Sequence, residues 1–237
     1  ASPLAWPLGT VYADPGATAL DNVDGTISLN IVVNSTAVNT ALLGSYVVTY
    51  NVTDAAGNAA VQVTRTVNVT DQTLPVVTPP ANIVVPAVDA TGTPASNAAI
   101  VAFLAGATAL DNVDGILTAF ITNNAPAQFP LGATIVTFSV TDAAGNVGTA
   151  QATVTVTDQT VPVITLVGAN PLTWTLGTPY VDPGATASDN VNGDLSASIV
   201  VDASGVNTAV AGPYSVIYTV TDAAGNVAQI TRTVNVQ

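Results

Sequence analysis

The chain of 237 residues is long enough for one large domain or for two to three small ones. Its formal net charge is −13, every acidic residue is Asp, and it contains no Lys, Glu, His, Cys or Met. This composition excludes a disulfide framework and thiolate chemistry, and it argues against nucleic acid and anionic membrane surfaces as partners. No apolar run reaches the ~18 residues that a membrane-spanning helix needs, so we expect no membrane insertion.

Three copies of one motif order divide the chain into repeats. Each copy contains GATA, then DNVDG or DNVNGD, and then TDAAGN. The three TDAAGN strings are Thr53–Asn58, Thr141–Asn146 and Thr221–Asn226. A repeat of this length is too long for a solenoid unit and fits a small β-sandwich.

Strict alternation of apolar and polar residues precedes each TDAAGN string. Val48, Tyr50 and Val52 share one phase in the first repeat, and the other two repeats show the same pattern. Such alternation, rich in β-branched and aromatic residues, predicts a half-buried strand. A second strand follows, so TDAAGN is predicted to be a hairpin turn in which Gly supplies the positive φ.

The linkers between the repeats are short and nearly identical. They read VTDQTLP and VTDQTVP, at Val69–Pro75 and Val156–Pro162. Their Pro residues limit flexibility, which favours an elongated rod. We therefore predict an all-β chain of three immunoglobulin-like β-sandwich domains, with boundaries at 1–70, 71–157 and 158–237.

The first repeat is incomplete by comparison with the third. Ala1–Asn22 aligns with Ala169–Asn190, but the strand predicted at Val161–Gly168 has no counterpart in repeat 1. The open sheet edge can pair with another strand. Either the chain is cut from a longer array, or another subunit supplies the strand. On both readings we expect head-to-tail association, with the Gln237 end of one copy lying against the Asp21–Asp24 and Asp54 end of the next.

Repeats 1 and 3 share the pattern Y-x-DPGATA-x-DN-x-(D/N)-G … Y-x-V-x-Y-x-VTDAAGN … R-x-V-x-V. This pattern resembles the bacterial surface protein Ig-like domain. Repeat 2 lacks the DPG and the Arg, and it is similar to the related hyalin-type (HYR-like) repeat. The resemblance implies an exported, tandemly repeated module of the kind found in adhesins, cell-surface proteins and stalks of secreted enzymes.

Tracing the strands of a sandwich up and down places the DNVDG loop, the TDAAGN turn and the preceding linker at one end. The Asp residues expected to converge there are Asp21, Asp24 and Asp54 in repeat 1, Asp71, Asp111, Asp114 and Asp142 in repeat 2, and Asp158, Asp189, Asp194 and Asp222 in repeat 3. Converging carboxylates repel each other unless a cation neutralises them, and Ca²⁺ accepts 6–8 oxygen ligands with tolerant geometry. The alternative is that these sequences form ordinary Asx turns without an ion.

Two further sets of residues invite a functional reading. The equivalent residues Trp6 and Trp174 could stack on carbohydrate if exposed, although a Trp in an alternating segment is more often a core residue. No His or Cys is present to act as a base or a thiolate nucleophile, and the Asp pairs recur in all three repeats. We therefore predict that the chain is not an enzyme.

The chain's two basic residues, Arg65 and Arg232, fall in the last strands of repeats 1 and 3. Only these repeats carry Asp in the DPG turn, at Asp14 and Asp182. We predict the structural ion pairs Asp14–Arg65 and Asp182–Arg232 at the sandwich end opposite TDAAGN, with Leu104 and Ala152 as apolar replacements in repeat 2. The alternative is that a β-bulge turns each Arg towards solvent.

Together these features predict a structural or adhesive segment of an extracellular bacterial surface protein or fibre. The alternative is a carbohydrate-binding accessory module of a secreted enzyme.

Overall fold

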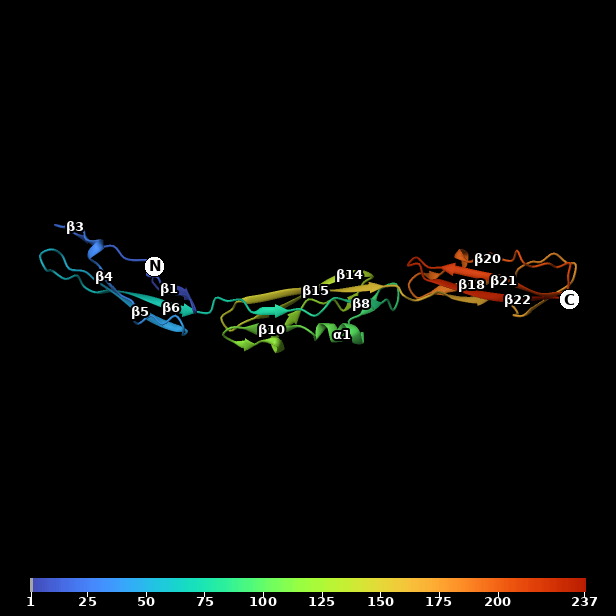
Figure 1. The fold of residues 1–237 in the computed structure, drawn as a ribbon, viewed down its shortest axis with the longest axis horizontal. Helices are drawn as coiled ribbons and strands as arrows, with labels where there is room; N and C mark the ends of the chain where they lie inside the picture. The colour runs from blue at the N-terminus through green and yellow to red at the C-terminus, as the bar shows by residue number, and fades with distance from the viewer. Residues whose placement is uncertain (1) are drawn as a thin grey trace. The chain divides into compact units, whose positions relative to one another are not determined.

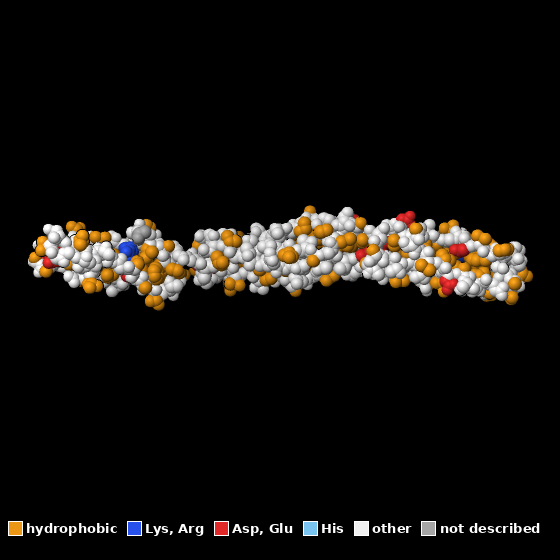
Figure 2. All heavy atoms as spheres, turned by 90° about the horizontal axis from the view of Figure 1, so that it is seen from above, with side chains coloured by type: hydrophobic (Ala, Val, Ile, Leu, Met, Phe, Trp, Pro, Cys, Tyr) orange, Lys and Arg blue, Asp and Glu red, His pale blue; other side chains and the backbone are white. Residues whose placement is uncertain are grey.

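The computed structural model describes residues 2–237 (Figure 1). Their regular secondary structure is almost entirely β-strand, with one α-helix and short 3₁₀ turns, which confirms the predicted all-β class. The chain divides into two compact units, described separately below. The first contains the chain up to Val77 with Ala109–Ile121 and Ser139–Thr149, and the second contains Thr78–Thr108, Thr122–Phe138 and Ala150–Gln237. The face shown in Figure 2 carries few charged side chains, as the composition requires.

In the first unit, repeat 1 forms a four-stranded sheet in the order β1-β6-β5-β4. The strands are β1 (Leu4–Pro7), β4 (Val32–Asn34), β5 (Gly44–Asn51) and β6 (Val63–Thr70). A two-stranded sheet of β2 (Leu20–Asp21) and β3 (Gly25–Thr26) lies between β1 and β4 in the chain and leads into the 3₁₀ turn η1 (Ser28–Asn30). The buried side chains of Val48, Tyr50 and Val67 form the core of this repeat.

The first unit also contains the TDAAGN end of repeat 2. Its strands β7 (Val76–Thr78), β10 (Thr108–Asp111) and β11 (Gly115–Ile116) form a three-stranded sheet in the order β11-β10-β7, and η2 (Thr118–Phe120) follows them. Ala109, Leu117 and Val140 are buried in the core here, with Val77 packed against them.

The remaining elements of repeat 2 are strands and one short helix, and they belong to the second unit except for Ser139–Thr149. The elements are β8 (Ile83–Pro86), β9 (Thr93–Pro94), α1 (Ala98–Leu104), β12 (Thr122–Asn123), β13 (Gln128–Phe129), β14 (Gly132–Thr141) and β15 (Val147–Thr157). The main sheet has the order β12-β14-β15-β8, and β13 pairs with β9.

Repeat 3 lies wholly in the second unit and shows the complete two-sheet arrangement. Its elements are β16 (Val163–Leu166), β17 (Leu172–Trp174), β18 (Ala185–Asp189), β19 (Gly193–Asp194), η3 (Ser196–Ser198), β20 (Val200–Asp202), β21 (Gly212–Thr221) and β22 (Val227–Val236). One sheet has the order β16-β18-β19 and the other β17-β22-β21-β20. Val216, Tyr218, Val234 and Val236 are buried between them.

The hairpins predicted from alternation are present in all three repeats. β5 and β6 pair antiparallel, with Tyr50 opposite Val63, and they lie side by side in Figure 1. β21 and β22 pair from Gly212–Val236 to Thr221–Val227, next to the third TDAAGN turn. Gly225 in that turn has φ 93°, a left-handed conformation that Gly adopts without steric cost.

The helix α1 is the main element that alternation does not predict. The side chain of Asn97 accepts a hydrogen bond from the Ala99 N–H and so caps the N-terminus of the helix. Ile100 and Phe103, three residues apart, are its buried side chains. At seven residues the helix is too short to show a sustained 3.6-residue period.

Candidate metal centre

The DNVDG loop of repeat 2 is an Asx turn that fixes one carboxylate at the end of β10. One oxygen of Asp111, Oδ2, accepts hydrogen bonds from the Val113 N–H at 2.7 Å and the Asp114 N–H at 3.0 Å. The loop then places Asp114 so that its Oδ2 accepts the Ala143 N–H at 2.8 Å. This second bond joins the loop to the TDAAGN turn.

The TDAAGN turn fixes the next carboxylate by the same chemistry. Asp142 accepts the backbone N–H of Asn146 through Oδ1 and the Asn146 side-chain amide through Oδ2, each at 2.7 Å. The Asn146 amide also reaches the carbonyl of Asp71 in the linker, at 3.4 Å. The turn therefore holds Asp142 in place and contacts the incoming chain.

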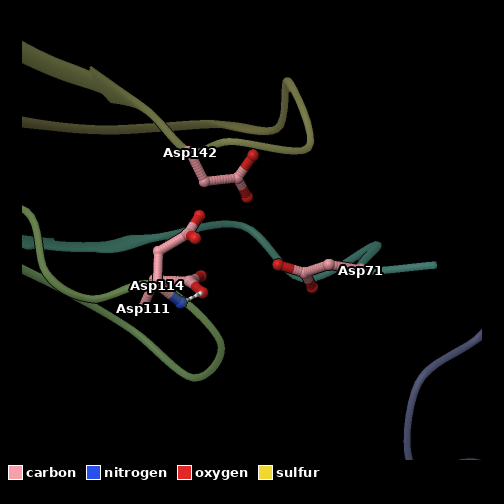
Figure 3. A group of neighbouring side chains, drawn as sticks. All are labelled: Asp71, Asp111, Asp114 and Asp142. Carbon is pink, nitrogen blue, oxygen red and sulfur yellow. Dashed lines mark hydrogen bonds between the residues drawn. The ribbon is translucent and has the colours of Figure 1, made fainter. Parts of the chain in front are cut away.

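The linker supplies the fourth carboxylate. Asp71 Oδ1 accepts the Thr73 N–H at 3.0 Å and the Thr73 hydroxyl at 2.5 Å. As a result, Asp71, Asp111, Asp114 and Asp142 each offer an oxygen, and these atoms lie within 4.8 Å of one another. Figure 3 shows the carboxylates arriving from three separate chain segments at one place.

Two oxygens of this cluster are buried without a hydrogen-bond partner among the described residues. They are Oδ2 of Asp71 and Oδ1 of Asp111. Asp71 as a whole residue is 7% exposed, and Asp111 is 5% exposed. The chain's two basic residues, Arg65 and Arg232, pair elsewhere and cannot neutralise them. Because burying an unpaired carboxylate oxygen is costly, these two atoms favour a ligand at this position.

The fixed turns also keep carboxylates in the clusters ionised. Burial raises the pKa of Asp142, but the hydrogen bonds from Asn146 outweigh it and leave the pKa below its ordinary value. The same balance, with Asn226 as donor, lowers the pKa of Asp222. In repeat 1, hydrogen bonds from Asn58 lower the pKa of Asp54. At neutral pH these groups are anions in the protein.

Equivalent clusters occur in the other two repeats. Asp21, Asp24 and Asp54 converge in repeat 1, and Asp158, Asp189 and Asp222 converge in repeat 3. In the third repeat, Oδ2 of Asp158 and Oδ2 of Asp189 are also buried without a partner in the part of the chain that the structure describes.

The expectation that Asp194 joins the third cluster is wrong. Its Oδ1 accepts the Ser196 N–H at 2.9 Å and the Ser196 hydroxyl at 2.6 Å, outside the cluster. The DNVNGD string carries Asn192 where the other repeats have Asp24 and Asp114. Asn192 Oδ1 accordingly accepts the Ala223 N–H at 3.3 Å, as those Asp side chains do in their own repeats.

Comparison with known proteins places these repeats in families. Residues 1–69 and 164–236 match the family described as "Bacterial surface protein, Ig-like domain", and residues 70–156 match the HYR domain. The chain belongs to the bacterial surface protein Ig-like domain family. Its middle repeat is a HYR domain, so the predicted resemblance is confirmed.

Relatives of the whole array include two proteins named hyalin. The chain is 35% identical over 202 residues to hyalin of Lytechinus variegatus and 36% identical over 207 residues to hyalin of Strongylocentrotus purpuratus. Each match covers 82% of this chain but only 37% and 16% of the relative, so the chain spans well under half of either protein. Among solved structures, extracellular cadherin domains 1–4 of protocadherin gamma B7 align with 98% of this chain and 73% of that chain, at 12% identity and a TM-score of 0.36.

The two Ig-like repeats contain both ion pairs that the sequence predicts. Arg65 Nη1 lies 3.2 Å from Asp14 Oδ2, and Arg232 Nη1 lies 3.2 Å from Asp182 Oδ1. Arg232 is fully buried, so no bulge turns it to solvent. The predicted location at the end of the sandwich is wrong. Arg232 lies opposite Val216, near the middle of the β21–β22 ladder, and Asp182 of the DPG turn reaches Tyr218 and Arg232 there.

Two Tyr hydroxyls complete each ion pair, which the sequence analysis missed. Tyr12 and Tyr50 both donate to Asp14 Oδ2, at 2.7 and 2.5 Å, and Tyr180 and Tyr218 both donate to Asp182 Oδ1. Burial and these hydrogen bonds raise the pKa of Tyr50 and of Tyr180 to about 12. The repeated Y-x-D string was the available signal for this arrangement.

The HYR repeat replaces this polar group with apolar side chains. Ala152 is buried at the Arg position, as predicted, but Leu104 is only half-buried at the end of α1. The neighbouring Phe103 enters the core instead, and its ring centroid lies 5.8 Å from that of Phe138. Phe138 occupies the position of Tyr50 and Tyr218 and lacks their hydroxyl.

The two Trp residues pack against the cores of the Ig-like repeats. Each is half-buried and meets a Tyr ring edge-on, Trp6 with Tyr12 at 5.0 Å and Trp174 with Tyr180 at 5.1 Å. This packing favours the core role over an exposed sugar-stacking platform. None of the helices in residues 2–237 has both the length and the apolar character needed to cross a membrane.

Proposed function

We propose that this chain is a structural or adhesive segment of an extracellular bacterial surface protein, in which Ca²⁺ fastens each linker to the repeat that follows it. The proposal is supported by the membership of repeats 1 and 3 in the surface Ig-like family and by the likeness of the array to hyalins. The observation that carries the cation is the pair of buried, unpartnered oxygens of Asp71 and Asp111.

Calcium suits these clusters better than magnesium. The four carboxylates of repeat 2 come from a linker, a loop and a turn. Ca²⁺ accepts such irregular oxygen sets, whereas Mg²⁺ requires a near-ideal octahedron and retains water. The exclusively Asp composition and the absence of His and Cys disfavour zinc and copper.

The charge-removing double variant Asp71→Asn with Asp158→Asn tests the proposal. An Asn oxygen can still accept the bonds from Thr73 and Thr160, so each linker turn is kept while one negative charge is removed. We expect Ca²⁺ affinity, measured by isothermal titration calorimetry on the full chain, to fall by roughly tenfold or more because ligand charge sets affinity.

Without an ion the same variant should behave in the opposite way. In chelator, removing a charge from the repulsive clusters of repeats 2 and 3 should raise the melting temperature of the variant above that of the native chain. The matched control is Asp89→Asn, because Asp89 makes the same turn with Thr91 outside any cluster. No heat of Ca²⁺ binding to the native chain, with equal melting in calcium and chelator, would refute the cation and leave Asx turns alone.

A further inference from the structure

One face of the second and third repeats is covered by a strand that follows the linker. In repeat 3 this strand is β16, which pairs antiparallel with β18 from Val163–Ser188 to Leu166–Ala185. Its inward side chains, Ile164 and Leu166, pack against the buried core of β21 and β22. In repeat 2 the corresponding strand β7 pairs with β10.

The corresponding face of repeat 1 is a groove of about 390 Å³. No strand among residues 2–237 pairs with the outer edge of the segment Ala17–Asp21. The groove is mostly apolar, and its lining includes Ala17, Ala19, Ile27, Ile31, Val52 and Val63.

Equivalent positions of repeats 1 and 3 differ in exposure on this face. Val63 is 64% exposed, whereas its equivalent Ile230 is half-buried. Ala19 is half-buried, whereas its equivalent Ala187 is 3% exposed in β18, where it pairs with Ile164 of β16. Equivalent apolar positions are therefore more exposed in repeat 1 than in repeat 3, where a strand is present.

The hydrogen bonds of Arg65 and Arg232 give an independent indication that a strand fits this groove. In repeat 3, Arg232 Nη2 donates to the carbonyl of Val167, at the end of β16, at 2.6 Å and to that of Gly184 at 3.0 Å. In repeat 1, Arg65 Nη2 donates to the equivalent carbonyl of Gly16 at 2.9 Å. The Arg65 side chain is 16% exposed, whereas that of Arg232 is 0% exposed. Arg65 thus points a donor towards the place where a strand carbonyl would lie.

The acidic cluster of repeat 1 has no Asp from a linker among residues 2–237. The segment leading into β7 or β16 brings Asp71 or Asp158 to its cluster, whereas the described cluster of repeat 1 consists of Asp21, Asp24 and Asp54. A strand entering the groove in the register of β16 would bring its own Asp to this cluster.

We propose that this groove binds the linker strand of a neighbouring Ig-like repeat, with the sequence Asp-Gln-Thr-(Leu/Val)-Pro-Val followed by alternating apolar residues. The strand pairs antiparallel with Ala17–Asp21 and inserts every second side chain over Tyr50 and Val63. Its Asp joins the cluster of Asp21, Asp24 and Asp54. Strand addition of this kind gains affinity from main-chain hydrogen bonds and specificity from alternate side chains. The strand docking does not depend on the cation proposed above.

The test uses the full chain and a synthetic peptide with the sequence of Val156–Leu166, VTDQTVPVITL. We expect saturable binding at one site per chain by isothermal titration calorimetry. Placing Asp at the two inward positions, Ile164 and Leu166, should weaken binding roughly tenfold or more. Placing Asp at the outward positions, Val163 and Thr165, is the matched control and should leave most of the affinity.

A variant of the chain locates the peptide. Ala17 lines the groove and is exposed, so Ala17→Lys should fold normally and abolish most of the binding. Leu29→Lys introduces the same side chain at a fully exposed position outside the groove and should bind like the native chain. Binding that is equal for the inward and outward peptides, or unaffected by Ala17→Lys, would overturn the proposal.

Light scattering shows whether the chain is monomeric, and the binding experiment is repeated in calcium and in chelator. In a monomer no second copy occupies the groove. A monomeric chain that fails to bind the peptide under both conditions would therefore contradict strand docking. Peptide binding in chelator supports docking even if the chain binds no Ca²⁺. If the peptide Asp also joins a cation site, calcium should strengthen binding of the native peptide but not of its Asp158→Asn form.

Discussion

At the residue scale, the most informative contrast is between the polar group of the Ig-like repeats and the apolar one of the HYR repeat. Asp182 accepts bonds from Tyr180, Tyr218 and Arg232 in repeat 3. The guanidinium of Arg232 also lies over the Tyr218 ring, with its carbon 5.4 Å from the ring centroid. Every partner of the carboxylate is replaced together in repeat 2, which indicates that the group acts as a unit.

Arg232→Ala should therefore destabilise repeat 3 more than Arg65→Ala destabilises repeat 1. Arg232 is fully buried, and its loss leaves the carboxylate of Asp182 without its cation, at a cost of roughly 3 kcal/mol or more. Arg65 is partly exposed, so water can replace some of its bonds. Urea denaturation of the two variants measures the difference in unfolding free energy.

The double variant Asp182→Leu with Arg232→Ala checks the origin of that loss. It should recover only part of the stability, because the hydroxyls of Tyr180 and Tyr218 lose their acceptor. Adding Tyr218→Phe, which copies Phe138 of repeat 2, should recover more. If the substitutions at Asp182, Arg232 and Tyr218 changed the unfolding free energy independently and additively, these residues would not act as a unit.

The same Tyr residues predict a loss of stability at high pH. The pKa of Tyr50 and Tyr180 is about 12 in the folded protein, against about 10 for an unperturbed Tyr. Between these values the unfolded state releases protons that the folded state keeps, so stability present below pH 10 falls as the pH rises towards 12. Melting temperature against pH, with absorbance at 295 nm to follow phenolate, measures this. Combining Tyr50→Phe with Tyr180→Phe should make the decline shallower, and an unchanged slope would contradict the assignment.

At the element scale, periodicity predicted the hairpins and missed the helix. Each long hairpin has one face in a core, so burial imposes a period of two on its sequence. α1 has only two buried side chains, Ile100 and Phe103, and its other residues are three Ala, Val101 and Leu104, which are too few to define a helical period. The Asn97 cap was readable, but a cap before seven residues does not distinguish a helix from a turn.

Phe103→Ala should show that α1 belongs to the core. Phe103 is 4% exposed and packs on Phe138, so its truncation should cost roughly 3–5 kcal/mol. Val101→Ala on the same helix is the control, because Val101 is 51% exposed and its loss should change stability by roughly 0.5 kcal/mol or less. Chemical denaturation followed by circular dichroism compares them, and similar small effects would place the helix outside the core.

At the scale of the whole molecule, the repeats made the acidic clusters predictable but not their details. Three copies of the same loop and turn at the same strand ends imply that their Asp residues meet, which the structure shows for ten of the eleven residues named. Asp194 was misassigned because it follows the DNVNG string directly, although aligning the repeats places Asn192 at the position of Asp24 and Asp114. The predicted domain boundaries remain a prediction.

The last prediction concerns the response of the whole chain to calcium and pH. A chain of net charge −13 whose buried carboxylates face each other should be stabilised by any cation that binds only the folded state. Millimolar Ca²⁺ should raise the melting temperature more than NaCl of equal ionic strength, since salt only screens exposed charges. At a concentration 100 times the Kd, one such site adds about 2.7 kcal/mol.

The stabilisation by calcium should decrease as the pH falls. The pKa values of Asp54, Asp142 and Asp222 are below their ordinary value, so these three proposed ligands remain charged until the pH falls below that value. The calcium effect should thus be fully present at pH 7 and disappear as the pH falls through the lowered pKa values, when protons displace the ion. Melting curves in calcium and in chelator at pH 7, 5 and about 3 follow the difference. A calcium effect that persists undiminished in acid would show that the ion acts somewhere other than these carboxylates.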